Sequence, residues 1–244
     1  MQSGNIGAAA RAMKNMGLRR LAVVAPRALD IDRARWMAPG ATDVLDAAVW
    51  APDVATAVAG ARLVLGTTAR GRHNRWPAVD LDGAAAAAWA EPGEVAVLFG
   101  PEDSGLGNDD LAHAHALLHI PTDAHASLNL AQATLLVAAA FFGQATREGW
   151  VPRPEGEGRR GGPARDLPPG PTAPTIAAPA GALEPLVTEW MATLDQGTYL
   201  RGHEPVLVAN TLRRLLTRAA LDHQEISVLR GMMRKLRWRM SNPP

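Results

Sequence analysis

The amino-acid sequence predicts an α/β fold built on a parallel β-sheet. Over the first 150 residues, short runs that are apolar throughout alternate with helix-like segments. Strands buried on both faces of a parallel sheet have this continuous apolar pattern, whereas half-exposed strands alternate apolar and polar residues. The helix-like segments are long enough to cross over between parallel strands. Together these observations favour strand–helix–strand units over an antiparallel or all-helical fold.

The predicted elements follow one another in a regular order. The candidate strands are Leu21–Ala25, Leu63–Gly66, Val95–Gly100 and Leu117–Ile120. The helix-like segments are Ile6–Met16, Pro52–Ala59, Ala84–Trp89, Asp109–Ala116 and Leu128–Arg147. We therefore expect residues 1–150 to form one α/β domain.

The composition changes after this domain. Residues 151–182 are rich in Pro and Gly and poor in large apolar side chains, so they predict a flexible linker. Residues 183–244 then predict a small all-α extension. Its last helix is expected to begin with a capping pair, Asp222 and Glu225, and to bury one periodic face. That face consists of Ile226, Leu229, Met233 and Leu236.

Composition also excludes several classes of protein. The chain has no cysteine, which excludes disulfide scaffolds, thiolate zinc sites and thiol nucleophiles. No apolar run approaches the roughly 18–20 residues of a membrane span, and the start of the chain does not have the pattern of a secretory signal. We expect a cytoplasmic protein with no membrane partner.

Charge is distributed unevenly along the chain. Residues 1–148 hold 12 basic and 15 acidic side chains, whereas residues 201–244 hold nine basic and three acidic ones. A basic helical extension beside a mildly acidic domain predicts an element that faces a polyanion. A solvated helical face is the alternative interpretation.

The first segment that indicates chemistry is Gly4–Lys14. Its small residues allow close backbone approach, Asn5 stands where a helix N-cap would be, and Arg11 follows on the same helix. A helix that simply packs tightly on a sheet would have the same pattern.

Two further segments each follow a predicted strand. Val97–Asn108 runs from a buried strand into a loop with three glycines, at the sheet edge where α/β proteins bind ligands. It has neither the phosphate-loop nor the dinucleotide-binding pattern. Ile120–Gln132 leads from a strand into a long helix that Ser127 could cap. Its amides, Asn129 and Gln132, need partners, which a ligand or a facing subunit would supply.

Together with Gly66–Arg70, these three segments resemble in their order the motifs of the TrmH-like branch of the SPOUT methyltransferases. The resemblance is closest to the TrmJ type, the tRNA 2′-O-ribose methyltransferases that act on position 32 of the anticodon loop. Residues 4–150 contain the motifs. Leu212–Ala219 and Glu225–Gly231 resemble the helical C-terminal extension of the TrmJ type.

The resemblance implies a homodimer that binds S-adenosylmethionine in a deep C-terminal trefoil knot. Threaded chains are rare, and periodicity alone does not predict one. The implied cofactor-binding residues are Thr67, Thr68, Ala69, Gly100, Ile120, Ala126, Ser127 and Leu128.

The resemblance also implies catalytic roles for Arg11, Asn5, Ser127 and Asn129. A guanidinium holds its proton too firmly to act as a general base. We therefore expect Arg11 to orient the ribose and its phosphate and to stabilise the developing alkoxide. Glu102 and Asn108 are expected to shape the loop of the knot.

The basic extension is expected to grip the tRNA backbone through contacts that are sensitive to salt. The candidate RNA-binding residues are Arg213, Arg214, Arg218, Arg230, Arg234 and Arg237. Trp190, Tyr199 and Trp238 could stack bases, but core packing is the interpretation we favour for at least Trp190.

Family members begin with a β-strand ahead of the segment that corresponds to Gly4–Lys14. Only three residues precede Gly4 here, so we expect that strand to be missing. A start assigned too late is the interpretation we favour. A catalytically impaired knotted RNA-binding protein is one alternative, and an rRNA 2′-O-methyltransferase of the same superfamily is another. His113, His115 and His119 do not have convincing metal-ligand spacing, and we expect no metal.

Overall fold

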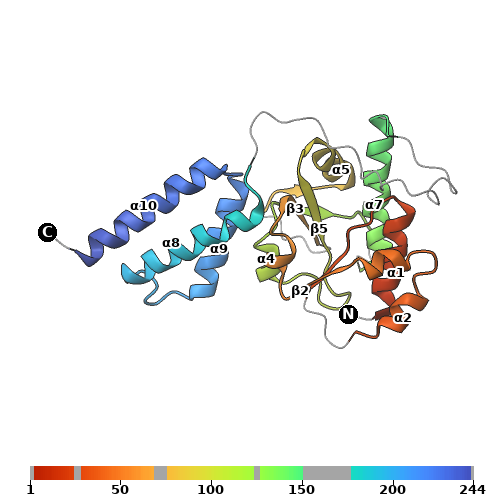
Figure 1. The fold of residues 1–244 in the computed structure, drawn as a ribbon, viewed down its shortest axis with the longest axis horizontal. Coiled ribbons are helices and arrows are strands. Elements are labelled where there is room, and N and C mark those ends of the chain that lie inside the picture. The colour runs from red at the N-terminus through yellow and green to blue at the C-terminus, as the bar shows by residue number, and fades with distance from the viewer. Residues whose placement is uncertain (1–2, 25–28, 69–75, 124–126, 151–176, 243–244) are drawn as a thin grey trace.

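The computed structural model describes residues 3–24, 29–68, 76–123, 127–150 and 177–242. These residues form an α/β unit and, beside it, a group of long helices made by the C-terminal part of the chain (Figure 1). No helix in the described ranges is long and apolar enough to cross a membrane.

The strands of the α/β unit are paired in parallel throughout the described residues. β1 (Ala22–Val24) pairs with β2 (Val49–Ala51). A four-stranded sheet has the order β4-β6-β3-β5, made of β4 (Ala78–Val79), β6 (Ala116–His119), β3 (Ala61–Thr68) and β5 (Glu94–Leu98). The predicted parallel α/β fold is confirmed, and each of the four predicted strands is present. β2 and β4, which have three and two residues, were not predicted.

The sheet is apolar in sequence because both of its faces are covered. Val64 and Leu117 belong to one core cluster, whereas their neighbours Leu65 and Leu118 belong to another. Since successive side chains of a strand point to opposite faces, consecutive apolar residues supply both cores. All four of these side chains are almost completely buried.

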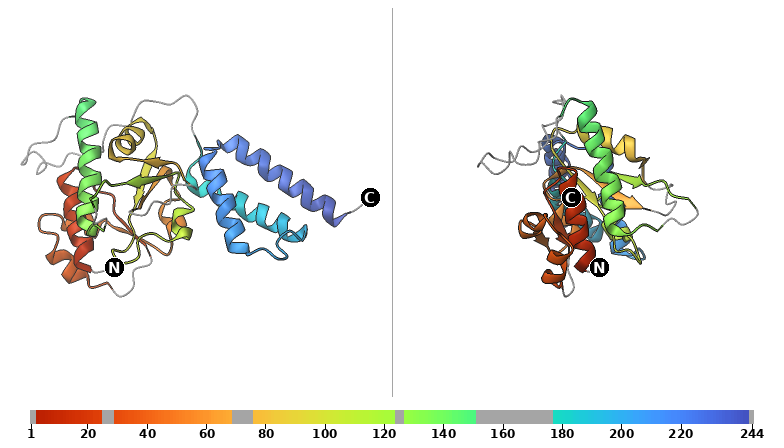
Figure 2. Two further views of the ribbon diagram at one scale, coloured as in Figure 1. Left: turned by 180° about the vertical axis from the view of Figure 1, so that it is seen from behind. Right: turned by 90° about the vertical axis from the view of Figure 1, so that its right-hand side faces the viewer.

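Three helices of ten or more residues belong to the described part of the α/β unit. They are α1 (Ser3–Asn15), α5 (Leu81–Ala90) and α7 (Leu130–Arg147). α7 contacts both α1 and α5, and α1 and α7 lie side by side in Figure 2. The predicted helices over these segments are confirmed within a few residues.

Four short helices complete the α/β unit in the part of the chain that the structure describes. α2 (Ile31–Trp36) and α3 (Thr42–Asp46) were not predicted, whereas α4 (Val54–Ala57) falls inside the predicted Pro52–Ala59. α6 (Asn108–Leu111) ends well before the predicted Ala116, because Ala116 begins β6.

Aspartate caps explain where several of these helices begin. The carboxylates of Asp30, Asp53 and Asp80 each accept a hydrogen bond from the backbone N–H three residues later, at 3.0, 2.8 and 2.8 Å. An N-cap carboxylate satisfies a backbone donor that the helix itself leaves free. These local contacts fix the first turns of α2, α4 and α5.

The two sheets remain separate in hydrogen bonding. Within the described ranges, β1 and β5 each pair with a strand on only one edge. The facing ends of these strands are nevertheless close, because Arg20 Nη2 lies 3.1 Å from Glu94 Oε1. Val24 and Ala96 also pack against one and the same core cluster. Side-chain contacts thus connect β1 with β5, although these two strands do not pair in the described ranges.

The C-terminal helices form a unit with a core of its own. It contains the short helix η2 (Ala180–Ala182) followed by α8 (Glu184–Gln196), α9 (Pro205–Arg218) and α10 (His223–Ser241). We call η2 and α8–α10 the helical unit. Its buried side chains include Leu183, Leu186, Val187, Leu216 and Ile226.

α10 begins with the predicted capping pair. Asp222 accepts a hydrogen bond from the N–H of Glu225 at 2.8 Å, and Glu225 accepts one from the N–H of Asp222 at 3.0 Å. Ile226 and Met233 are buried as predicted, but Leu236 is 51% exposed. At 100° per residue, Leu236 lies about 80° from Ile226 around the helix, whereas Arg237 lies only about 20° away. The covered face of α10 therefore continues at the half-buried Arg237 and not at Leu236.

The predicted linker differs from the structure at its C-terminal end. Residues 151–176 lie outside the described residues, but residues 177–182 are packed. The N–H of Ala178 donates to the carbonyl of Leu221, and the N–H of Gly181 donates to the carbonyl of Ala59, both at 2.8 Å. A Cβ at Gly181 would lie 2.7 Å from that Ala59 oxygen. The packed helical unit thus begins before the predicted boundary at residue 182, because these backbone contacts hold it against the α/β unit.

Replacing Gly7 with Ala should destabilise the protein. A Cβ at this position of α1 would lie 1.9 Å from the carbonyl oxygen of Ala34, so α1 and α2 would have to separate. We expect the free energy of unfolding to fall by about 1–3 kcal/mol in urea titrations.

Gly231→Ala is the matched control, since Gly231 also lies within a helix but a Cβ there meets nothing within 4 Å. It should raise the free energy of unfolding by about 0.5–1 kcal/mol. Equal effects of the two substitutions would contradict the close α1–α2 contact.

Acidification should destabilise the fold through His115. Burial lowers the pKa of His115 from 6.5 to about 4, and its Nδ1 accepts a hydrogen bond from the N–H of Val64 at 3.0 Å. Because this histidine binds its proton more readily in the unfolded chain, its stabilising contribution is present above pH 6.5 and is lost towards pH 4. The loss should reach about 3 kcal/mol.

His115→Gln removes the titrating ring and keeps a hydrogen-bond acceptor. Denaturant unfolding between pH 7 and pH 4 should therefore show a flatter pH dependence for this variant than for the wild type. An unchanged slope in His115→Gln would refute the assignment.

Candidate active site

Polar side chains from three distant segments meet at the edge of the sheet where β3, β5 and β6 end. Asn5 belongs to α1, Glu102 to the loop after β5, and Asn129 is the N-cap of α7. The side-chain amide of Asn5 donates a hydrogen bond to the Glu102 carboxylate and accepts one, at 3.4 Å, from the side chain of Asn129. One amide thus joins the first, second and third motifs.

The start of α7 supplies its own partners for the amides in this motif. Asn129 Oδ1 accepts from the N–H of Ala131 at 2.9 Å, and Gln132 Oε1 accepts from the N–H of Asn129 at 3.3 Å. The cap of α7 is therefore Asn129 rather than Ser127, which is exposed. Similarly, Asn5 lies inside the first turn of α1 and is not its N-cap. Its amide is thereby free to reach across to the loops.

Glycine is required in the loop that carries Glu102. A Cβ at Gly100 would lie 2.3 Å from both the carbonyl carbon of Gly105 and the nitrogen of Leu106. Gly105 has φ +66° and donates its N–H to the carbonyl of Pro101 at 2.7 Å. The chain folds back on itself here and leaves no room for a side chain. Gly100 therefore shapes the loop through backbone contact.

The end of β3 forms the neighbouring wall of the site. Thr67 Oγ1 donates to the carbonyl of Leu98 at 2.8 Å, which ties this end of β3 to β5. In the register of the sheet, Thr67 and Thr68 lie opposite Leu118 and His119 of β6. Two of the predicted cofactor-binding residues, Ala69 and Ala126, lie outside the described residues.

Apolar side chains complete the same edge. Ile120 is buried in a core cluster with Leu65 and Leu118, and Leu128 packs against that cluster. Half-buried threonines, a tightly folded glycine loop and these aliphatic side chains together offer backbone polar groups and apolar surface. The site described here thus combines neutral groups with one carboxylate, that of Glu102.

Arg11 does not converge with these residues. It is exposed on α1, six residues after Asn5 and so about 9 Å farther along the helix axis. Within the described part of the chain it makes no hydrogen bond or ion pair. Its guanidinium is therefore available to a bound substrate or to another chain.

Arg213 and Arg214 lie at the junction between the helical unit and the α/β unit. Arg213 donates to both carboxylate oxygens of Glu184, at 2.8 and 3.1 Å, and to Asn210 at 2.8 Å. Asn210 in turn donates to Asp109 of α6. Arg214 lies over the ring of the buried Trp76, with its guanidinium carbon 5.2 Å from the ring centroid.

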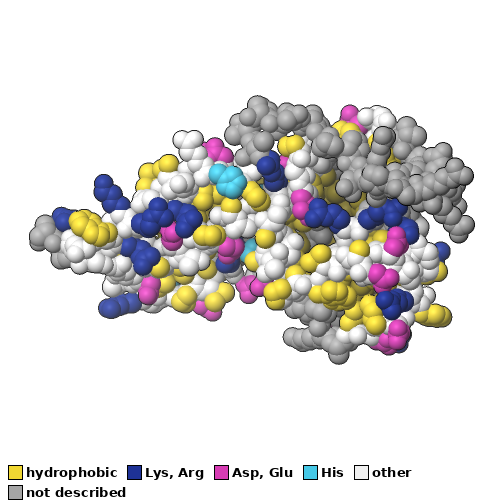
Figure 3. Space-filling model, viewed as in Figure 1, with side chains coloured by type: hydrophobic (Ala, Val, Ile, Leu, Met, Phe, Trp, Pro, Cys, Tyr) yellow, Lys and Arg dark blue, Asp and Glu magenta, His cyan; other side chains and the backbone are white. Residues whose placement is uncertain are grey.

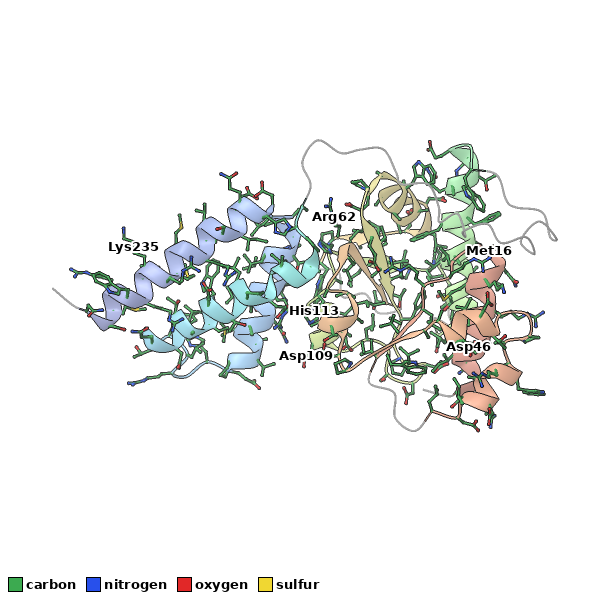
Figure 4. The ribbon with its side chains drawn as sticks, in the orientation of Figure 1. Met16, Asp46, Arg62, Asp109, His113 and Lys235 are labelled. Atoms are coloured by element: carbon green, nitrogen blue, oxygen red, sulfur yellow. The ribbon has the colours of Figure 1, made fainter. Side chains whose placement is uncertain are left out.

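An open cleft of about 320 Å³ lies at this junction, between α4 and α6 on one side and α9 on the other. Figure 4 labels two of its residues, Asp109 and His113, where the two units meet. His113 Nδ1 is 3.7 Å from Glu184 Oε1. Burial, followed by the nearby charge of Arg213, lowers the pKa of His113. The same Arg213 that pairs with Glu184 thus disfavours the protonated form of His113.

Of the remaining candidate RNA-binding arginines, two lie near a glutamate of α8 and two have no acidic partner among the described residues. Arg230 lies 2.7 Å from Glu189 Oε1 of α8, and Arg234 lies 3.7 Å from the same oxygen. Arg218 is exposed and Arg237 is half-buried. The acidic partners Glu184 and Glu189 could not be found from the sequence, because they are 29 and 41 residues away from Arg213 and Arg230 and lie on another helix.

The fold and the site are those of an α/β domain with its ligand-binding edge at the carboxyl ends of parallel strands, joined to a helical unit rich in arginine. The chain belongs to the SpoU rRNA methylase family, whose model matches residues 1–139. Residues 181–244 match the model described as the C-terminal domain of the tRNA methyltransferase TrmJ. The resemblance inferred from the motifs is confirmed.

Individual relatives cover nearly the whole chain. The tRNA (cytidine/uridine-2′-O-)-methyltransferase TrmJ of Photorhabdus laumondii is 34% identical over 234 residues, which are 95% of this chain and 90% of that protein. The tRNA (cytidine/uridine/adenosine-2′-O-)-methyltransferase TrmJ of Pseudomonas aeruginosa is 36% identical over 236 residues, 94% of this chain and 88% of that protein.

Solved structures give the same result. The crystal structure of TrmJ from Z. mobilis ZM4 matches with a TM-score of 0.79 and 34% identity, covering 96% of this chain and 94% of that one. A probable methyltransferase from Bordetella pertussis matches with a TM-score of 0.55 and 37% identity, over 59% of this chain and 89% of that one.

Substituting Arg213 should weaken the junction. Arg213→Gln leaves the Glu184 carboxylate without its bidentate partner beside the half-buried His113, so the free energy of unfolding should fall by about 1–3 kcal/mol. Urea unfolding followed by circular dichroism measures the change.

Arg218→Gln is the control for that experiment, since it removes a charge from an exposed position on the same helix. Its effect on stability should stay within about 0.5 kcal/mol. If Arg213→Gln proved equally harmless, the junction would not depend on this ion pair.

Proposed function

We propose that this chain is an S-adenosylmethionine-dependent tRNA 2′-O-ribose methyltransferase that modifies position 32 of the anticodon loop. The observation that carries the proposal is the Asn5 amide, which joins Glu102 and Asn129 at the ligand-binding edge of the sheet. The similarity to TrmJ proteins over about 95% of the chain supports the same activity.

The residues at the sheet edge fit S-adenosylmethionine. A ligand with an adenine ring and an aliphatic chain needs apolar walls and backbone hydrogen bonds, and the glycine loop at Gly100 and the side chains of Ile120 and Leu128 can provide them. When bound, the cofactor supplies an electrophilic methyl group on a sulfonium. Thr67, Thr68, Gly100, Ile120 and the segment Ala126–Leu128 would hold it, in a trefoil knot formed by the second and third motifs.

The chain's own residues would position the ribose. The bound cofactor would supply its methyl group to a ribose 2′-hydroxyl, and the residues of the site would hold that hydroxyl in line with the methyl group. Arg11 would orient the ribose and its phosphate and stabilise the alkoxide by charge. The amides of Asn5 and Asn129, and the hydroxyl of Ser127, would hold the surrounding loops and the sugar in place.

The exposed Arg11 also supports a homodimer. Arg11 lies six residues after Asn5 on α1, and its guanidinium has no carboxylate partner among the described residues. In a symmetric pair, Arg11 of one protomer would complete a site built by the loops of the other.

One structural observation favours a second candidate, a knotted RNA-binding protein with impaired catalysis. The β1–β2 pair is not hydrogen-bonded to the four-stranded sheet in the described residues, and a weakened sheet would loosen the loops at its edge. Calorimetry with S-adenosylmethionine separates the two candidates, because an RNA-binding protein without activity need not recognise the cofactor.

The direct test is methyl transfer to defined RNAs. The purified protein is incubated with S-adenosylmethionine and either tRNA transcripts or ribosomal RNA, and the digested nucleosides are analysed by mass spectrometry. We expect 2′-O-methylated nucleosides from tRNA at position 32, and their absence from tRNA of cells that lack the protein. Methylation of ribosomal RNA alone would instead assign an rRNA enzyme.

Arg11→Lys tests the role of the guanidinium. Lysine keeps the charge but loses the planar, bidentate donor set, so turnover should fall by about 100-fold or more, as when a transition-state donor is removed. Binding of S-adenosylmethionine, measured by calorimetry, should be unchanged. Arg20→Lys, on the surface of the same unit, should retain wild-type turnover. Near-normal turnover of Arg11→Lys would exclude a bidentate role.

A further inference from the structure

We propose that the outer end of the helical unit binds unpaired nucleobases of the RNA substrate, with the stacked rings of Tyr199 and His203 as the platform. This outer end, which we call the tip, consists of the loop of residues 197–203 and the last turns of α10. The inference rests on the proposed function, because it assigns a contact to the tRNA that the enzyme would modify.

The two rings are already arranged as a platform. Tyr199 and His203 are parallel within 8°, with centroids 4.6 Å apart. His203 Nδ1 lies 2.8 Å from the carbonyl oxygen of Tyr199, which fixes the imidazole over the phenol. Tyr199 is nevertheless 52% exposed and His203 is exposed. A stacked pair that contributes little to the core offers its outer ring face to a planar ligand.

The loop that carries the rings is held in a fixed conformation. Thr198 has φ +61° and Gly202 has φ +88°, and a left-handed threonine is strained unless its surroundings impose it. The N–H groups of Thr198 and Tyr199 donate to the carbonyls of Asp195 and Leu194, both at 2.9 Å. A preformed loop loses little conformational entropy when it binds.

The end of α10 places further exposed groups beside this loop. Gln196 Nε2 donates to Ser241 Oγ at 2.7 Å and to the carbonyl of Arg237 at 3.3 Å, so the start of the loop and the last turns of α10 are in contact. Trp238 is 63% exposed. A second large aromatic side chain therefore lies on the element that borders the platform.

The charges around the tip favour an anionic partner. Arg201 belongs to the loop, two residues before His203. The adjoining part of α10 carries Lys235, Arg237 and Arg239, which form no ion pair with a carboxylate of the described chain. The acidic neighbours are Asp195 and Glu204. By contrast, Arg213 and Arg230 are paired with Glu184 and Glu189. Figure 3 shows dark blue side chains over the helical unit, and Figure 4 shows Lys235 on α10.

Exposed aromatic rings surrounded by cations are the combination that binds single-stranded nucleic acid. Every base has a π-face, so bases stack on such rings without regard to sequence, and the cations follow the backbone. Unstacked bases occur in the loops of folded RNA and are absent from a regular duplex.

The sequence makes a direct test possible because Tyr199 is the only tyrosine in the chain. Biosynthetic incorporation of 3-fluorotyrosine gives a single ¹⁹F resonance, which reports on the platform alone. Titration with an unmodified tRNA transcript, or with a single-stranded oligouridylate, should shift or broaden this resonance until saturation. A perfect RNA duplex of equal phosphate number should leave it in place.

The same titration can overturn the proposal. A resonance that stays unmoved while fluorescence anisotropy shows tRNA binding would exclude Tyr199 from the contact. An equal shift with the duplex would indicate a backbone contact without stacking. A shift caused by proteins and not by RNA would assign the tip to a protein partner.

Substitutions provide the second measurement. Tyr199→Ala should weaken tRNA binding by about 5- to 100-fold, as expected for the loss of one base–aromatic stack. Tyr199→Phe keeps the ring and should remain within about twofold of the wild type, whereas Tyr199→Leu should behave like Tyr199→Ala. The dependence of affinity on salt should be the same in all of them, because no phosphate contact is removed.

A matched control is Trp36→Ala, which removes an aromatic side chain that is 80% exposed on the α/β unit. Its tRNA affinity should equal that of the wild type. If the wild type fails to methylate tRNA, the proposed function fails. If the wild type methylates tRNA and Tyr199→Ala binds it equally well, only the present inference fails. Should Tyr199→Ala not fold, the ¹⁹F titration decides alone.

Discussion

The geometry of the candidate site depends on one side-chain amide. Asn5 donates a hydrogen bond to Glu102, 97 residues later in the chain, and accepts one from Asn129, 124 residues later. A single side chain thus contacts two distant loops. An amide suits this place because it is both a donor and an acceptor, which a carboxylate or an ammonium is not. The close packing of α1 on α2 at Gly7, where a Cβ would meet the backbone of Ala34, fixes the helix that carries Asn5. Packing between helices thus determines where the loops meet.

The arginines show why charge in a sequence is a weak guide to an interface. All six candidate arginines suggested a polyanion-binding surface equally well. In the structure Arg213 and Arg230 are neutralised by glutamates of another helix, and Arg214 covers a buried tryptophan. An arginine with a planar, multivalent guanidinium is well suited to such structural pairing. Among the six, Arg218 at the end of α9 and Arg237 on α10 have no acidic partner in the described residues. The cations near the end of α10 therefore move part of the expected RNA contact away from the junction.

The sequence was most informative where a local rule applies. Continuous apolar runs predicted β1, β3, β5 and β6, because both faces of the sheet are buried, and the pair Asp222 and Glu225 predicted the start of α10. The sequence was least informative where a residue's environment depends on contacts with residues far away in the chain. The exposure of Leu236 follows from which side of α10 meets α8, and the role of Glu184 follows from a contact 29 residues away. The motifs did predict that Asn5 and Asn129 share a site, but the cap of α7 was assigned to Ser127, because a hydroxyl two residues earlier satisfies the same pattern.

The contact of Gly181 with Ala59 has a consequence for how the two units are connected. The helical unit is anchored at its very first turn by a backbone hydrogen bond to the α/β unit, and the seating is completed by Asn210 and Arg214. Its orientation is therefore set by this seat and not by the length of the segment of residues 151–176. Insertions or deletions in that segment would change the chain length while leaving the tip at a constant reach from the sheet edge. The distance between an RNA contact at the sheet edge and one at the tip would then be the same in variants that differ only in the length of residues 151–176.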